Sequence, residues 1–328
     1  MPDDAKRSLM DRLEVAVDKM MRGESIVLAH DPEMGALMGI ASDLRDLPRE
    51  EFLSRLGQQL DEEGEKMLAT SHEVREGFRT VTPYVVVKEV NAIAEFLTQG
   101  LGAVQTFGSP EPGSGGGFHY EFRLGHSMLM VGGGGAYKGP EVTPALHYFV
   151  TDVDASYRQA IAAGATSIYE PVDQPYGVRE GSVRFAGVDW YLSSPMKNEQ
   201  GREVLGVGDL APYLHPKGTE DLIDFMKRAF GAEEMEVYRE PQGTGPIVHA
   251  KIRIQDSIVE LGEAHGQYQP KPTMLFLYVD DADAWFRRAV AAGAEVKTPM
   301  SDLPYGRTGA VQDSHGNLWH VCTPPAPK

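Results

Sequence analysis

The sequence contains a single cysteine, Cys322, in 328 residues. One cysteine excludes an internal disulfide framework and fits a reducing compartment. Basic residues are also scarce: 31 Lys and Arg against 48 Asp and Glu give a net charge of −17, and no basic run occurs. Nucleic acids and anionic membranes favour clusters of Lys and Arg, so the charge argues against both as partners.

Long apolar runs are absent as well. The first residues, MPDDAKRSLMDRL, lack the apolar centre of a secretion signal, and no segment approaches the length of a membrane span. A hydrophobic content of 41% and a charged content of 24% are ordinary for a globular protein. We therefore expect a cytoplasmic globular protein without a membrane partner.

One pattern occurs twice, as HYEFRLGHSMLMVG in residues 119–132 and HAKIRIQDSIVELG in residues 249–262. Each run places a two-residue turn between two alternating segments, which is typical of a β-hairpin. The turn pairs Leu124 with Ser127 and Ile254 with Ser257, and paired residues point to the same side. The apolar face then carries Tyr120, Phe122, Leu124, Leu129 and Val131 in the first copy, and Ala250, Ile252, Ile254, Val259 and Leu261 in the second.

The opposite face of each hairpin is largely polar. It carries His119, Glu121, Arg123, Met128 and Met130 in the first copy, and His249, Lys251, Arg253, Ile258 and Glu260 in the second. Unpaired charges are costly to bury, so we expect this face to line solvent or a wet cavity.

The repeat extends over the rest of the chain. TPYVVVKEVNAIAEFLTQGLGA matches APYLHPKGTEDLIDFMKRAFGA, and FVTDVDASYRQAIAAGAT matches YVDDADAWFRRAVAAGAE. Phe96 corresponds to Phe225 and Asp154 to Asp283, both offset by 129 residues (225 − 96 and 283 − 154). This indicates a tandem duplication, with domains at residues 80–200 and 205–325. Each domain reads as two units of one strand, one helix and three strands.

The residues before the repeat have a helical pattern. Leu9, Leu13, Val17 and Met20 recur at helical spacing. We expect residues 1–75 to form a helical segment for docking or for homodimerisation, with a regulatory or partner-binding role as the alternative.

The βαβββ units resemble the vicinal oxygen chelate superfamily of glyoxalase I, bleomycin and fosfomycin resistance proteins and extradiol dioxygenases. The segments that carry the resemblance are TPYVVV, DVDASYRQAIAAGA, DLPYGRTGAVQDSHGNLWHVCTP and the two hairpins. The resemblance implies an α+β fold in which the two units of a domain pack side by side and curl their sheets into a cup. It also implies a small-molecule ligand and chemistry of the lyase, isomerase or dioxygenase type.

The superfamily's metal positions, carried over to this sequence, favour the second domain. They fall on Ala211, Met274, Glu260 and His320 there, and on Thr82, Ala145, Met130 and Tyr191 in the first domain. Glu260 and His320 would thus hold a divalent metal, Zn, Fe, Mn or Ni, as a Lewis acid. A catalytic zinc normally has three protein ligands, so a third would come from His249, His215 or Tyr213. The alternative is an ion pair between Glu260 and its cross-strand neighbour Lys251, with His320 an ordinary histidine.

The first domain offers a different set of polar residues. His147 follows Ala145 at strand spacing and so shares its face. Around it we expect Tyr84, His119, Glu121, Arg123 and Tyr191. A His beside a Glu suits general acid–base catalysis near neutral pH, which makes His147 and Glu121 catalytic candidates beside Glu260 and His320. Alternatively, Glu121 and Arg123 pair while the aromatic residues fill the cup.

The sequence is consistent with two functions. One is a metal-dependent enzyme acting on a small polar or aromatic molecule, with Tyr213, Lys251 and Arg253 as further ligand-binding residues. The other is a metal-free protein that binds or sequesters a small molecule. Asp313, Ser314 and His315 are adjacent in sequence, so DSHGN is interpreted as a β-turn and not as a hydrolase triad.

Overall fold

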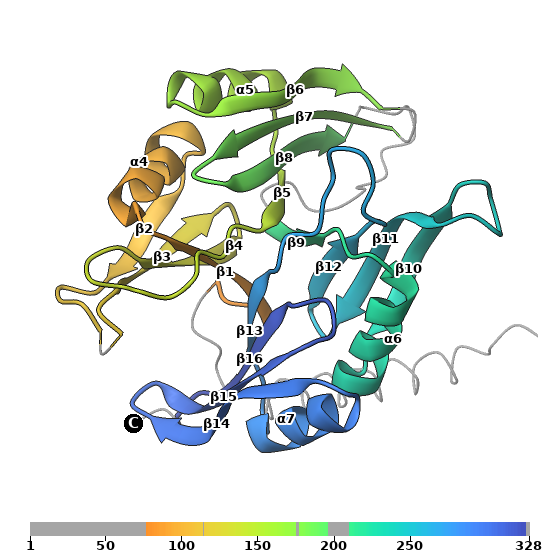
Figure 1. Cartoon of the computed structure of the whole chain (residues 1–328). Coiled ribbons are helices and arrows are strands. Elements are labelled where there is room, and N and C mark those ends of the chain that lie inside the picture. Colours follow the sequence, from red (N-terminus) through yellow and green to blue (C-terminus); the bar gives the residue numbers. More distant parts are fainter. Residues whose placement is uncertain (1–76, 114, 175–176, 196–209, 326–328) are drawn as a thin grey trace, which may run out of the picture. The chain divides into compact units, whose positions relative to one another are not determined.

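The structure, a computed structural model, describes residues 77–113, 115–174, 177–195 and 210–325. The helical segment predicted for residues 1–75 lies outside them. The described part of the chain is an α+β protein of four units, each with one strand, one helix and three further strands (Figure 1). This confirms the predicted fold class, whereas the boundaries 80–200 and 205–325 stay predictions.

The two units of the first half follow each other directly. The first comprises β1 (Val81–Val87), α4 (Val90–Gly100), β2 (Val104–Gly108), β3 (Phe118–Leu124) and β4 (Ser127–Gly133). The second comprises β5 (Ala145–Phe149), α5 (Val153–Ala162), β6 (Thr166–Asp173), β7 (Val178–Phe185) and β8 (Val188–Pro195).

The second half repeats this order. The third unit comprises β9 (Leu210–Leu214), α6 (Thr219–Phe230), β10 (Glu233–Arg239), β11 (Ile247–Ile254) and β12 (Ser257–Leu261). The fourth comprises β13 (Met274–Tyr278), α7 (Ala282–Ala291), β14 (Glu295–Leu303), β15 (Gly306–Gln312) and β16 (Leu318–Thr323). None of these described helices has the length and apolar character needed to cross a membrane.

Equivalent aspartates begin the second helix of each half. Asp152 precedes α5 and accepts a hydrogen bond from the backbone N–H of Ala155 (2.9 Å). Asp281 precedes α7 and accepts one from the N–H of Ala284 (2.8 Å). An aspartate in this position satisfies a backbone donor that the helix itself leaves unpaired. The repeated sequence therefore encodes the same helix start twice.

The strands form two eight-stranded sheets. Sheet A has the order β14-β15-β16-β13-β1-β4-β3-β2, and sheet B the order β10-β11-β12-β9-β5-β8-β7-β6. Each sheet thus joins one unit of the first half to one unit of the second. The expectation that the two units of one domain share a cup is wrong, because β1 pairs antiparallel with β13, and β5 with β9.

The helix-facing sides of the sheets form the hydrophobic cores. Helix α4 packs beside α5, and α6 beside α7 (Figure 1). One core contains the predicted apolar residues Phe122, Leu124, Leu129 and Val131, and the other contains Ala250, Ile252, Ile254, Val259 and Leu261. The hairpin pairs Leu124–Ser127 and Ile254–Ser257 are also as predicted. We call the side of each sheet that faces away from the helices its inner face.

Two serines at the hairpin turns join the halves of the chain. The Ser127 hydroxyl accepts a hydrogen bond from the backbone N–H of Leu210 (3.0 Å), where β9 begins. The Ser257 hydroxyl accepts one from the N–H of Val81 (2.8 Å), where β1 begins. Both serine side chains are buried. Each hairpin therefore holds the first strand of the other half.

Ser257→Ala is expected to lower the free energy of unfolding by about 1–3 kcal/mol, because the buried N–H of Val81 loses its acceptor. Chemical denaturation of the full chain measures this loss. The matched control is Ser314→Ala at an exposed turn, for which we expect a change within about 0.5 kcal/mol. An equal effect of both substitutions would contradict the role of Ser257.

Candidate functional site

The centre of sheet B brings polar residues from strands of two units onto one inner face. His147 lies on β5, Ser193 on β8 and Glu260 on β12. The β5–β9 pairing at the centre of the sheet brings these strands, from both halves of the chain, together. The strand pairing, and not sequence proximity, therefore creates the contact between residues 113 positions apart.

His147 and Glu260 form a buried ion pair. The distance from His147 Nδ1 to Glu260 Oε2 is 2.5 Å, and Glu260 has an exposed fraction of 0%. Burial lowers the pKa of His147, but the Glu260 carboxylate and the nearby Glu180 carboxylate outweigh this effect and raise it. Burial likewise raises the pKa of Glu260, whereas the charge and hydrogen bond of His147 bring it below the ordinary value. Each partner therefore favours the charged form of the other.

The hydrogen bonds continue on the other side of the imidazole. His147 Nε2 lies 2.6 Å from Ser193 Oγ, and the Ser193 hydroxyl donates to Glu180 Oε2 (2.9 Å). The Tyr169 hydroxyl donates to the other oxygen of Glu180. Because the Ser193 proton is directed to Glu180, His147 Nε2 must donate to Ser193. Both ring nitrogens of His147 thus carry protons, and neither has a lone pair for another ligand.

Aromatic rings form the more exposed part of this inner face. The Tyr213 and His215 rings stack at 4.7 Å between centroids, and His215 stacks on Tyr268 at 5.3 Å. The Tyr191 hydroxyl lies 3.0 Å from His215 Nε2. Burial is the main cause that lowers the pKa of His215 to about 4, so this ring is neutral near pH 7. The stacked rings therefore present a flat and uncharged surface.

The inner face of sheet A is more apolar. Its buried residues include Met128, Met130, Phe276 and Cys322. A polar group lies at one side, where the Tyr84 hydroxyl is 2.9 Å from His119 Nδ1 and His119 Nε2 is 3.3 Å from Glu121 Oε1. The two inner faces are thus chemically different although the halves of the chain are related.

A sequence profile described as "Glyoxalase/Bleomycin resistance protein/Dioxygenase superfamily" matches residues 216–321. An uncharacterized protein of Mycobacterium bovis is 34% identical over 127 residues, which are 35% of this chain and 82% of that protein. The chain belongs to the Glyoxalase/Bleomycin resistance protein/Dioxygenase superfamily. An uncharacterized protein of Mycobacterium tuberculosis H37Rv is also 34% identical over 127 residues, 74% of its length. The resemblance predicted from the sequence is confirmed.

Solved structures share this fold over most of the chain. Glyoxalase I of Zea mays has a TM-score of 0.57 at 12% identity, over 75% of this chain and 92% of that chain. A putative dioxygenase of Bacillus subtilis has a TM-score of 0.51 at 14% identity, over 74% of this chain and 84% of that chain. At these identities the likeness concerns the fold alone.

The structure separates several residues that the sequence analysis grouped. Glu260 lies on β12 in sheet B, whereas His320 lies on β16 in sheet A, so the two do not share a site. His147 and Tyr191 share sheet B, but the other residues expected around them lie on sheet A: Tyr84, His119, Glu121 and Arg123. These residues are separated because β1 pairs with β13, and β5 with β9, so that the two units of one half belong to different sheets.

The predicted basic residues are engaged elsewhere. Lys251 lies opposite Glu260, as expected, but its ammonium group pairs with Glu236 at 2.9 Å. Arg253 pairs with Glu233. Arg123 does not pair with Glu121 through any described salt bridge, and its guanidinium donates to the Gly125 carbonyl (3.4 Å).

Sequence reasoning missed Ser193, Glu180, Tyr169 and Tyr268. Ser193 follows Tyr191 at strand spacing, so alternation alone would have placed it on the same face. Glu180 lies opposite Ser193 in the β7–β8 pair, which only the strand register reveals. Tyr268 lies in a loop and has no periodic signal.

Superfamily members often bind a divalent metal, but the residues on these inner faces do not fit one. Glu260 holds His147, and His249 Nδ1 is hydrogen-bonded to the Tyr213 hydroxyl (3.1 Å). His320, the other predicted ligand, lies in sheet A. Within the described ranges, no group of three or more His, Cys, Asp or Glu residues is arranged to hold a metal ion.

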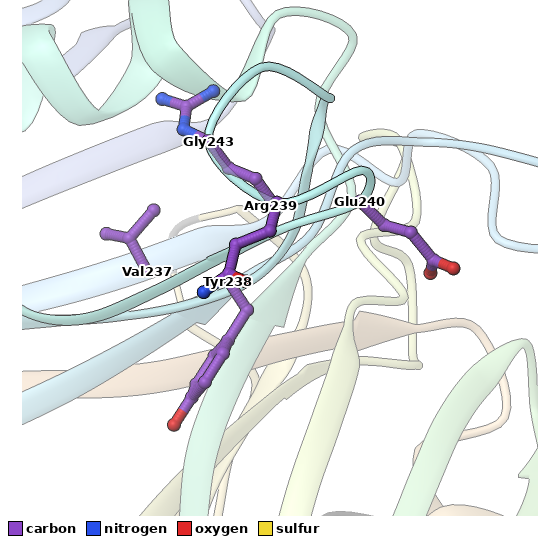
Figure 2. Close-up of a pocket in the computed structure, with 6 residues that line it drawn as sticks. Val237, Tyr238, Arg239, Glu240 and Gly243 are labelled. Atoms are coloured by element: carbon purple, nitrogen blue, oxygen red, sulfur yellow. The ribbon is translucent and has the colours of Figure 1, made fainter.

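A separate pocket of about 560 Å³ lies at the end of edge strand β10. Figure 2 shows Tyr238 and Arg239 pointing to opposite sides of this strand. The Tyr238 ring lies 6.2 Å from the His249 ring, whereas Arg239 pairs with Glu220 at 2.5 Å. The guanidinium group of Arg239 is thus already paired, and the pocket lies apart from the His147–Glu260 site.

Proposed function

We propose that this superfamily member binds a small, neutral, planar molecule on the inner face of sheet B, and that it does so without a metal. The observation that carries the proposal is the arrangement of charge on this face. The His147–Glu260 pair is buried, Lys251 is paired, and the partly exposed surface consists of the stacked rings of Tyr213, His215 and Tyr268.

Stacking and hydrogen bonding would both contribute to such binding. A planar ligand packed on an aromatic ring gains about 0.5–1.5 kcal/mol beyond the effect of burial. The Tyr191 hydroxyl lies among these rings, 3.0 Å from His215 Nε2, and adds a polar group that can hydrogen-bond a ligand. His147, Glu260 and Lys251 each already have an ion-pair partner, so a charged ligand would find no free counter-ion among them. A neutral ligand is therefore favoured.

A second candidate function is acid–base catalysis, because His147 is protonated and hydrogen-bonded to a serine. The superfamily includes enzymes, so this candidate deserves a direct test. Both N–H groups of His147 are already donated, to Glu260 and Ser193. Proton donation to a substrate would require one of these bonds to open. Recovery of every ligand unchanged after incubation with the protein would favour binding alone.

The test uses the full chain purified without chelator. We expect elemental analysis to find no stoichiometric metal, and bicyclic heteroaromatic probes such as quinoline to bind in saturation-transfer NMR. His215→Ala and Tyr268→Ala should each weaken binding about fivefold to tenfold, since each removes a stacking partner. The matched control is Tyr148→Phe on the helix-facing side of β5, which should leave the affinity unchanged.

Two results would overturn the proposal. One is a stoichiometric metal whose removal abolishes probe binding. The other is probe binding that His215→Ala and Tyr268→Ala leave as strong as in the parent protein.

A further inference from the structure

The connection between β12 and β13 reaches from the second half of the chain to the first. Residues 265–272, which we call the strap, lie between two ends that are fixed within the second half. The N–H of Ala264 donates to the Pro216 carbonyl (2.8 Å), and the N–H of Thr273 donates to Asn317 Oδ1 (3.1 Å). Between these ends the connection extends to the β7–β8 hairpin (Figure 1). The strap therefore bridges the two halves.

Lys271 makes the contact with the first half. Its ammonium group lies 2.7 Å from the Gly187 carbonyl oxygen and 2.7 Å from Asp189 Oδ2. Among the described hydrogen bonds and ion pairs, these two are the ones that join the strap to the first half. Asp189 is itself held in place, because Arg184 donates to both of its carboxylate oxygens, at 2.5 and 3.0 Å. The lysine is thus bound to a well-ordered pair of acceptors.

The strap has a defined conformation of its own. Pro270 and Pro272 flank Lys271 and restrict the backbone on both sides of it. His265 and Tyr268 exchange two backbone hydrogen bonds, of 2.9 and 2.8 Å. Tyr268 and Lys271 are half-buried, whereas the other strap residues are exposed. Breaking the Lys271 contacts would therefore release a stiff segment that carries Tyr268 with it.

Tyr268 covers the aromatic part of the inner face of sheet B. Its ring stacks on His215 at 5.3 Å and lies 6.3 Å from the Tyr191 ring, measured between centroids. Tyr191 is only 5% exposed, and Nδ1 of His215 is buried. A ligand can reach these two residues only after Tyr268 has moved.

Sheet A cannot form the same contact. Trp190 and Trp319 are equivalent in the repeat (319 − 190 = 129), so the position equivalent to Asp189 is Leu318, which has no carboxylate. The corresponding connection in the first half, residues 134–144, carries Glu141, which accepts a hydrogen bond from the N–H of Lys88 in its own half. The lysine contact is therefore specific to sheet B.

We propose that the strap is a gate over the site on sheet B, held closed by the contacts of Lys271 with Asp189 and Gly187. When these contacts break, the strap moves away with Tyr268 and uncovers Tyr191 and His215. When they form again, Tyr268 closes on the bound ring. What the gate admits rests on the proposed function, whereas its opening does not require a ligand.

Lys271→Met in the full chain tests the gate, because methionine keeps an apolar side chain and removes the ammonium group. Two rates, both followed by mass spectrometry, report on opening: chymotrypsin cleavage after Tyr268, and modification of His215 by diethylpyrocarbonate, which requires an accessible neutral imidazole. Each rate should rise about tenfold, since the closed state loses a charged hydrogen-bond donor.

Two controls separate the gate from general effects. Lys297→Met removes a lysine whose ion pair with Glu295 lies on the exposed edge of sheet A, and it should leave both rates unchanged. His265 is exposed on the strap itself, so its modification should be equally fast in the parent protein and in Lys271→Met.

Three results would overturn the gate. The first is that Lys271→Met changes neither rate. The second is faster cleavage after Tyr268 without faster modification of His215, because the strap would then open without uncovering the site. The third is an equal rise in the labelling of the buried Cys322 thiol, which would indicate loosening of the whole fold.

Quinoline distinguishes the gate from the proposed function. If both hold, saturating quinoline should slow cleavage after Tyr268, because the strap closes on the bound ring. If quinoline binds neither the parent protein nor Lys271→Met, the proposed function fails, while the cleavage and modification rates still decide whether the gate exists.

Discussion

His147→Leu is expected to lower the free energy of unfolding by about 3–5 kcal/mol near pH 6, because it leaves the Glu260 carboxylate buried without its partner. Glu260 has an exposed fraction of 0%, so water cannot replace the lost interaction. Ser193 also loses its hydrogen bond from His147 Nε2. Chemical denaturation of the full chain measures the change.

The double variant His147→Leu/Glu260→Leu tests whether the two residues act as a pair. Each single substitution leaves one buried charge, whereas the double substitution removes both charges. We therefore expect the double variant to lose less stability than the sum of the single losses, with a coupling of about 1–3 kcal/mol. Additive losses would contradict the ion pair.

The pH dependence of this pair follows from the two pKa shifts. The pKa of His147 lies above its ordinary value of 6.5, so its contribution is complete below pH 6.5 and is lost as pH rises through the raised pKa. The pKa of Glu260 lies below its ordinary value of 4.5, so its contribution is complete above pH 4.5 and is lost as pH falls through the lowered pKa. The stabilisation by the pair should therefore be largest between pH 4.5 and 6.5. A stability difference between the parent protein and the double variant that does not change with pH would contradict this assignment.

Asp313→Ala is expected to destabilise the protein by at least about 3 kcal/mol, since one buried carboxylate accepts several hydrogen bonds in the DSHGN turn. Asp313 Oδ1 accepts from the backbone N–H groups of His315 and Asn317, both at 2.9 Å. Asp313 Oδ2 accepts from the Asn317 amide and from Trp319 Nε1, also at 2.9 Å. The substitution leaves these donors, most of them buried, without an acceptor.

Denaturation monitored by tryptophan fluorescence measures this loss, and the indole N–H resonance of Trp319 reports the broken bond directly. The control is Asp302→Ala, an exposed carboxylate 3.3 Å from Arg307, for which we expect less than about 1 kcal/mol. Unchanged chemical shift of the Trp319 indole in Asp313→Ala would contradict the proposed contact.

Local patterns predicted much of the fold. Alternation and turn length determined the register of both hairpins, and the DSHGN segment was correctly interpreted as a turn, because these features depend on residues close in sequence. Internal repetition identified the tandem units. The same reasoning placed His147 on the inner side of its strand.

Local patterns could not predict which units share a sheet. The antiparallel pairing of β5 with β9 depends on how whole units pack, and nothing in either strand alone specifies the partner. The assignment of Glu260 and His320 to one site was wrong for this reason, although both residues were correctly recognised as polar inner-face positions. The contact between His147 and Glu260 was missed for the same reason.

The crossed sheets make the molecule equivalent to a dimer whose two subunits have been fused. Either half alone would present an unpaired edge at its first strands, and two identical halves could rebuild the sheets only by association that depends on concentration. A covalent connection replaces that requirement with an effective concentration on the order of millimolar. It also removes the symmetry that identical subunits impose on their sites. The two faces were therefore free to diverge, with Glu121 and Met130 on one and Lys251 and Glu260 on the other, so that one chain carries two inner faces of different chemistry.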